Sequence, residues 1–88
     1  MSENQIKERV FKVVSNIMGV SLREVDENSS PDTLEKWDSL QHMNLILALE
    51  EEFGVQFTDS QIVDMLNVQL IIMTVEELCQ ERHDIKKK

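Results

Sequence analysis

The residues best suited to chemistry lie close together, where Asp38 and Ser39 are followed by His42. An acid, a serine and a histidine are parts of a nucleophilic site, which also needs a base within hydrogen-bonding reach and amide donors for an oxyanion. Such a serine usually sits on a glycine-flanked turn, whereas Ser39 stands between Asp38 and Leu40. The catalytic set is therefore incomplete, and we expect no catalytic residue. A minimal hydrolase that uses Ser39 and His42 would need an oxyanion site that the sequence does not offer.

Asp38 and Ser39 also have the pattern of a helix start. A carboxylate at position 38 can accept hydrogen bonds from the free amides of the first turn, and Gln41 stands where a capping-box partner belongs. We predict a helix over 39–53, ended by Gly54. His42 would lie on its surface, where a histidine is more often a solvated residue than a functional contact.

The helix over 39–53 carries apolar side chains on two sides, as an increment of about 100° per residue shows. One side holds Leu45, Ile46, Leu49 and Phe53, and the opposite side holds Leu40, Met43 and Leu47. Only one side can face the core of so small a domain. An exposed apolar side bordered by Glu50 and Glu51 indicates a docking surface, and we predict Met43, Leu47, Glu50 and Glu51 as its members.

The rest of the chain predicts a single all-α domain over 1–88, a small four-helix bundle. Apolar residues at three-and-four spacing, with helix start and stop signals, place the other helices at 3–18, 59–66 and 68–83, with a tail at 84–88. A long loop at 20–37 separates the first two helices, and Leu22, Val25 and Leu34 are its expected anchors to the core.

Side-chain caps support these helix starts. Ser2 with Gln5 and Thr58 with Gln61 have the form of capping boxes. Two starts compete for the last helix: a cap at Asn67, or a later capping box of Thr74 with Glu77. We prefer Asn67, because the apolar period runs unbroken through Thr74.

Composition limits the kinds of partner. The 88 residues include nine basic and seventeen acidic side chains, a net charge of −8, which repels nucleic acid and anionic membranes and attracts basic protein surfaces. The single cysteine, Cys79, shares the helical phase of the apolar residues Val75 and Leu78 in the last helix, which indicates a structural thiol. The segment 26–32 lacks the glycine and glutamate of a calcium loop, so we expect no metal site. We expect a cytoplasmic monomer.

The stretch from Trp37 to Leu40, followed by a helix that ends in Leu-Glu-Glu-Glu-Phe (49–53), resembles the modification site and second helix of acyl carrier proteins. The chain length, the acidity and the long loop before the serine extend the resemblance over nearly the whole chain. In that family the serine of Asp-Ser-Leu carries phosphopantetheine, here Ser39.

The resemblance implies a carrier that holds acyl groups as thioesters on a phosphopantetheine arm derived from CoA. Asp38 would help to position the magnesium of the phosphopantetheinyl transferase, or serve only as the helix cap. The residues that match the family's acyl pocket are Ile46, Leu49, Phe57 and Ile62. The implied partners are the transferase and the enzymes that load and modify acyl groups in fatty-acid, polyketide or related biosynthesis.

Several features bear on the branch of the family. Gln41, His42 and Asn44 stand where carriers of fatty-acid synthesis often have acidic residues, and Trp37 is more familiar from specialised pathways. Peptidyl carriers typically have glycines before the serine, and this chain has none there. The alternatives are a peptidyl or aminoacyl carrier and an acidic helical adaptor without a prosthetic group.

Overall fold

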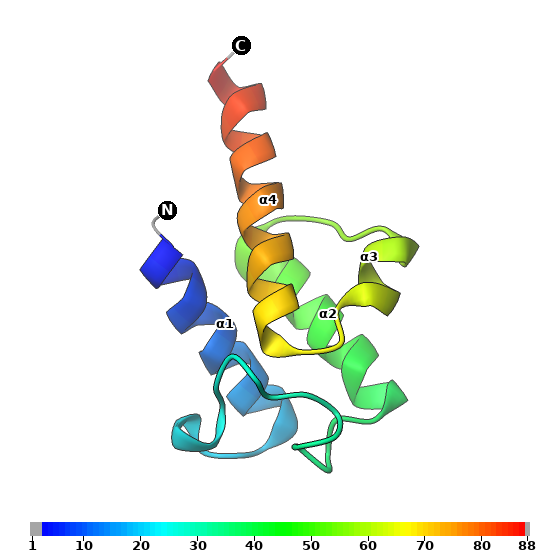
Figure 1. Cartoon of the computed structure of the whole chain (residues 1–88). Helices are drawn as coiled ribbons and strands as arrows, with labels where there is room; N and C mark the ends of the chain where they lie inside the picture. The colour runs from blue at the N-terminus through cyan, green and yellow to red at the C-terminus, as the bar shows by residue number, and fades with distance from the viewer. Residues whose placement is uncertain (1–2, 88) are drawn as a thin grey trace.

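The computed structural model describes the backbone of residues 3–87 and the side chains of residues 4–79. In that range the chain forms α1 (Glu3–Met18), a 3-10 turn η1 (Leu22–Glu24), α2 (Ser39–Phe53), α3 (Asp59–Asp64) and α4 (Val68–Lys87). α1 packs against both α2 and α4, and the segment between α1 and α2 runs across one end of the bundle (Figure 1). The predicted all-α, four-helix fold is confirmed.

The core is built from the apolar stripes of the three longer helices. Val10 and Val14 of α1, Leu45 and Leu49 of α2 and Val68, Ile71 and Val75 of α4 are completely buried. Their three-and-four spacing places them on one face of each helix. Burial of such side chains contributes about 1.5–3 kcal/mol each relative to exposure, so these stripes decide how the helices are oriented.

Gly19 ends α1. Its φ of 68° lies in the left-handed region, which a residue with a Cβ adopts only at a cost. This turn lets the Gly19 and Val20 amides both donate to the Ser15 carbonyl, at 2.9 and 3.1 Å. The Ser2 and Gln5 capping box predicted at the other end of the helix falls on Ser2, which lies outside the described residues.

The long segment after α1 is held by three buried side chains, Val25, Leu34 and Trp37. The prediction of Leu22 as an anchor was wrong, because that side chain is 48% exposed. Leu22 lies in η1, whose short turn points it outward, and Val25 turns into the core at the end of η1 instead.

The same segment closes the N-terminus of α4. The Val68 and Gln69 amides donate to the carbonyls of Ser29 and Glu27, at 2.9 and 3.0 Å. The Leu70 amide donates to the Asn67 side-chain oxygen at 2.8 Å. Asn67 is therefore the cap of α4, as preferred over Thr74, and the loop satisfies amides that a helix start leaves without partners.

Two helix ends differ from the prediction. α3 ends at Asp64 rather than at 66, because Met65 leaves the helical conformation with ψ of 72° and its side chain becomes buried. α4 continues to Lys87 instead of ending at 83. No glycine or proline interrupts residues 84–87, and basic residues at the end of a helix are favoured by its dipole.

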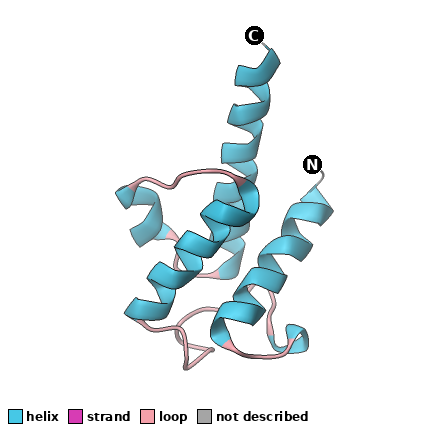
Figure 2. Ribbon diagram, turned by 180° about the vertical axis from the view of Figure 1, so that it is seen from behind, coloured by secondary structure: helices cyan, strands magenta, loops and turns pink. Residues whose placement is uncertain are grey.

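The last turns of α4 project beyond the other helices, as views from both sides show (Figures 1 and 2). α3 lies beside α2 at the opposite side of the bundle from α1 (Figure 2). No helix in the described part of the chain is both long and apolar enough to cross a membrane.

The cap of α4 gives the first testable prediction. Replacing Asn67 by alanine removes the acceptor of the Leu70 amide, so we expect a loss of about 1 kcal/mol in the free energy of unfolding. Urea denaturation measures the change. Gln69→Ala, at an exposed position of the same turn, is the matched control and should change stability by less than about 0.5 kcal/mol. Equal stability of the two variants would contradict the assigned cap.

Candidate functional site

Ser39 is the first residue of α2, and its side chain is exposed. Asp38, in extended conformation, caps the helix: its Oδ1 accepts a hydrogen bond from the Gln41 amide at 2.9 Å. Its carbonyl accepts from the His42 amide at 2.8 Å. The cap holds the serine hydroxyl at the solvent-facing end of the helix.

The first amides of α2 are open to a ligand. Among the described residues, the Ser39 and Leu40 amides have no hydrogen-bond partner, and the first turn carries no acidic residue. Free amides and the positive end of the helix dipole favour a bound anion. A phosphodiester on the Ser39 hydroxyl would lie beside these donors, so the residues at this position fit a phosphopantetheine group.

Gln41 does not complete the capping box that the sequence predicted. Its Nε2 instead donates to the Ile17 carbonyl at 2.7 Å, and its Oε1 accepts from Asn44 Nδ2 at 2.8 Å. The Ile17 carbonyl lies in the last turn of α1, where carbonyls lack partners within the helix. Gln41 reaches this nearby acceptor, and the first turn of α2 is thereby tied to the end of α1.

His42 is not the solvated surface residue that we expected. The ring is half-buried, and its Nδ1 accepts a hydrogen bond from Trp37 Nε1 at 3.0 Å. Its Nε2 lies 2.9 Å from the Ile62 carbonyl in α3. Trp37 is only 2% exposed, and a buried indole N–H needs an acceptor. The folding of Trp37 and α3 onto α2 therefore buries His42 between them.

The outer side of α2 is apolar and exposed, as predicted from the helical phase. Leu40, Met43 and Leu47 are 70%, 46% and 59% exposed. Four further exposed apolar residues were missed in the sequence: Val63 on α3, Leu66 just after it, and Leu70 and Met73 on α4. The inward-facing Ile62 could have indicated Val63, because adjacent residues of a helix point in different directions. Leu66 is exposed because the chain leaves the helical conformation at Met65.

The two glutamates predicted at the rim of this side are not equivalent. Glu50 is half-buried, and its Oε2 accepts a hydrogen bond from the Phe57 amide at 2.9 Å. Glu51 is exposed and forms no ion pair within the described residues. The next residue, Glu52, is paired with Arg9 of α1 at 2.7 Å. Of these three glutamates, only Glu51 has a carboxylate with no partner among the described residues.

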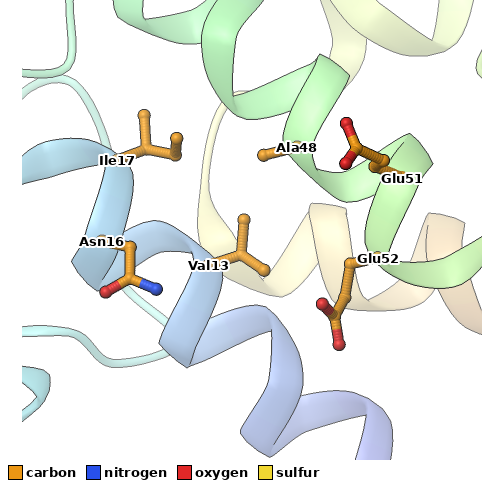
Figure 3. A pocket seen from close by; sticks show the side chains of 6 residues that line it. All are labelled: Val13, Asn16, Ile17, Ala48, Glu51 and Glu52. Atoms are coloured by element: carbon orange, nitrogen blue, oxygen red, sulfur yellow. The ribbon is translucent and has the colours of Figure 1, made fainter.

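The four residues matched to an acyl pocket belong to the same hydrophobic core or pack against it. Ile46, Leu49 and Phe57 lie in the core, and Ile62 is half-buried against it. A separate open hollow of about 300 Å³ lies between α1 and α2 (Figure 3). Its lining consists of Val13, Asn16, Ile17, Ala48, Glu51 and Glu52.

The hollow therefore shares no residue with the predicted acyl pocket, and Glu51 is one of its lining residues.

Among the described residues, no group of three or more histidine, cysteine or acidic side chains is arranged to hold a metal ion. Cys79 is half-buried and packs against the core.

The difference between Glu50 and Glu51 gives a matched test. Glu50→Ala leaves the Phe57 amide without its charged acceptor, so we expect a loss of about 1–2 kcal/mol in unfolding free energy. Glu51→Ala removes the same charge one residue away and should change stability by less than about 0.5 kcal/mol. Urea denaturation of both variants at one salt concentration compares them, and similar losses would show that the Glu50 hydrogen bond adds no stability.

Comparison with known proteins agrees with this geometry. The phosphopantetheine attachment site family matches residues 8–80. An acyl carrier protein of Chlorobium phaeobacteroides is 36% identical over 72 residues, covering 82% of this chain and 92% of the relative.

Two further relatives have the same name. An acyl carrier protein of Nitratidesulfovibrio vulgaris is 36% identical over 64 residues, which is 73% of this chain and 84% of that protein. One of Cyanidioschyzon merolae is 33% identical over 69 residues, 78% of this chain and 76% of the relative. Together with the open, serine-bearing start of α2, these matches show that the chain belongs to the acyl carrier proteins of the phosphopantetheine-attachment family.

Proposed function

We propose that Ser39 is the residue that carries the phosphopantetheine arm, through which this protein carries acyl groups. The supporting observation is the exposed hydroxyl at the first position of α2, beside two amides that have no partner in the described part of the chain. When bound, the arm supplies the thiol on which an acyl group is held as a thioester. The chain's own contribution is to anchor the phosphate where an anion is stabilised.

A second serine in a similar local context provides an internal comparison. Ser60 follows Asp59 in the first turn of α3 and is exposed, as Ser39 follows Asp38. In α3, however, the aspartate lies within the helix and Thr58 is the cap. The Asp59 carboxylate would repel a phosphate in the first turn of α3, so we expect Ser60 to stay unmodified.

Mass spectrometry after incubation with CoA, magnesium and a broad-specificity phosphopantetheinyl transferase tests the attachment site. We expect the mass of one phosphopantetheine to be added to the wild-type chain and to Ser60→Ala, and none to be added to Ser39→Ala. An unmodified wild-type chain, under conditions that convert another carrier, would refute the proposal. Addition to Ser39→Ala would place the arm elsewhere.

We propose two roles for Asp38. Its Oδ1 is used by the cap, whereas its Oδ2 has no partner within the described residues. The carboxylate can therefore keep the helix start in place and still present one oxygen to the magnesium ion of the transferase. Carboxylate oxygens are preferred magnesium ligands, which supports this assignment.

We propose that the acyl chain is sheltered by Ile46, Leu49, Phe57 and Ile62. Ile46 and Leu49 are at most 1% exposed, so a chain that enters among them must displace the half-buried Ile62 or its neighbours. NMR methyl and ring signals of these four residues should shift when octanoyl replaces the free thiol on the arm. Signals of Val13 and Ile17, in the separate hollow, are the control. Shifts confined to the control residues would place the chain in that hollow.

We propose that partner enzymes dock on the outer side of α2. Met43 and Leu47 supply exposed apolar area, and Glu51, one turn from Leu47, supplies a negative charge that forms no ion pair with any described residue. A rim charge mainly raises the association rate with a basic partner, whereas a desolvated apolar contact slows dissociation. The Glu50 carboxylate is engaged by the Phe57 amide, so we expect Glu50 to support the structure beside this docking side more than to attract a partner.

Initial rates of arm transfer by the phosphopantetheinyl transferase, measured over a range of salt concentrations, separate these contributions. Leu47→Ala should slow transfer at subsaturating carrier about tenfold at every salt concentration. Glu51→Lys should slow it about two- to fivefold at low salt, with the difference lost as salt screens the charge.

Two variants on α4 serve as matched controls, Leu70→Ala and Glu77→Lys, and both should retain the wild-type rate. Circular dichroism establishes that all four variants are folded. Wild-type rates for folded Leu47→Ala and Glu51→Lys would show that the enzyme docks on another surface.

Members of this family are carriers rather than catalysts, and they interact with phosphopantetheinyl transferases and acyl-handling enzymes. We further propose that this chain has no catalytic activity of its own and acts as a cytoplasmic monomer. The enzymes of fatty-acid, polyketide or related biosynthesis that load it would carry basic docking patches, because its net charge is −8.

A further inference from the structure

The hydrogen bonds of His42 determine where its proton lies. The indole N–H of Trp37 can only donate, so the Nδ1 that accepts from it must be unprotonated. Nε2 then carries the proton and donates to the Ile62 carbonyl. The arrangement therefore requires a neutral imidazole in one tautomer, and either a second proton or the other tautomer would remove the acceptor of the Trp37 indole.

The carbonyl at the other end of this bridge is one that α3 cannot satisfy. Ile62 lies in the last turn of α3, where carbonyls have no partner within the helix. The Leu66 amide, which would reach the Ile62 carbonyl in a longer helix, donates to the Asp64 carbonyl at 2.9 Å instead. The His42 ring thus caps α3 at its C-terminal end.

α3 has few other polar links to the bundle. Its N-terminal hydrogen bonds, between Thr58 and Gln61, stay within its own turn. Among the described residues, the bond from His42 to Ile62 is the one hydrogen bond between α3 and another helix. The planes of the His42 and Trp37 rings are inclined by only 20°, with centroids 6.1 Å apart. His42 therefore joins the segment before Ser39 to α3.

We propose that His42 is a positioning residue for the acyl carrier: its neutral ring couples Trp37, next to the attachment turn, to α3, so that movement of α3 is transmitted to Trp37. The inference rests on the proposed attachment at Ser39 and on the proposed shelter of the acyl chain beside Ile62. An acyl chain that displaces α3 then alters the surroundings of Trp37. Protonation of the ring removes the acceptor of the Trp37 indole and so breaks the bridge at its Trp37 end, while Nε2 can still donate to the Ile62 carbonyl.

Other charged groups lie on the elements around His42, but none of them is paired with its ring within the described residues. The charged side chains on the elements that meet at His42 are Glu35, Lys36 and Asp38 before α2, Glu50, Glu51 and Glu52 in the last turn of α2, and Asp59 and Asp64 on α3. A change in Trp37 that follows the titration of His42 would thus report the ring's own proton.

The first test uses the protein without its arm. Trp37 is the only tryptophan, so its emission and its indole N–H signal can be followed by pH titration together with the ring signals of His42. We expect both Trp37 signals to change with the same midpoint as His42. His42→Gln keeps a donor and an acceptor without a titrating proton and should abolish that pH dependence. His83→Gln, which removes the other histidine, should preserve it.

Amide hydrogen exchange tests the link to α3. His42→Ala removes both hydrogen bonds, and exchange of the protected α3 amides should become about tenfold faster, as expected for the loss of one hydrogen bond. His42→Gln should restore most of the protection. If His42→Ala does not fold, the titration of the wild type and of His42→Gln still decides the question, because neither depends on that variant.

The last measurement compares Trp37 emission with and without an octanoyl group on the arm. We expect a change in the wild type and in His42→Gln, and its loss in His42→Ala, while mass spectrometry shows equal arm attachment in all three. Two results would overturn the coupling. One is Trp37 signals that do not change as His42 titrates, and the other is an equal change in Trp37 emission on octanoylation in all three proteins. Failure of arm attachment in the wild type would refute the site at Ser39 and leave the titration result standing.

Discussion

The structure depends on a constraint in α2, which has apolar side chains on two sides but can bury only one of them in a bundle this small. The buried side packs Leu45 and Leu49 into the core, where neither is exposed to solvent. Rotating α2 by half a turn about its own axis would expose Leu45 and Leu49 and leave the chain without a continuous core. The opposite side, with Leu40 and Leu47, therefore stays in solvent and is available to a partner without any loss of core packing.

This orientation also determines where the first turn of α2, which begins with Ser39, lies. The first turn is held from several directions: Asp38 caps it, Gln41 bonds to the end of α1, and His42 bonds to Trp37 and to α3. Even so, the Ser39 hydroxyl is exposed. A turn that is fixed by its neighbours and open at its tip can present an arm in a defined place while the arm itself moves.

The three helix starts at α2, α3 and α4 differ in whether their first amides are already occupied. At α4 the loop carbonyls of Glu27 and Ser29 and the side chain of Asn67 occupy the first amides. At α3 an aspartate, Asp59, lies in the first turn. The start of α2 has no acid within its first turn, and its Ser39 and Leu40 amides have no partner among the residues that the structure describes. The long loop thus serves a structural purpose, since it closes α4 and leaves the start of α2 open.

What the sequence by itself determined is local: helix periods, the caps Asp38 and Asn67, and the stop at Gly19, because each of these signals acts within a few residues of itself. What only the tertiary structure decided are partners from distant segments. Glu50 accepts from Phe57, and His42 bridges two elements, because hydrogen-bonding groups buried when helices pack must find whichever partner lies nearest. Sequence spacing does not reveal that partner, since it is brought near only by the burial of apolar side chains elsewhere.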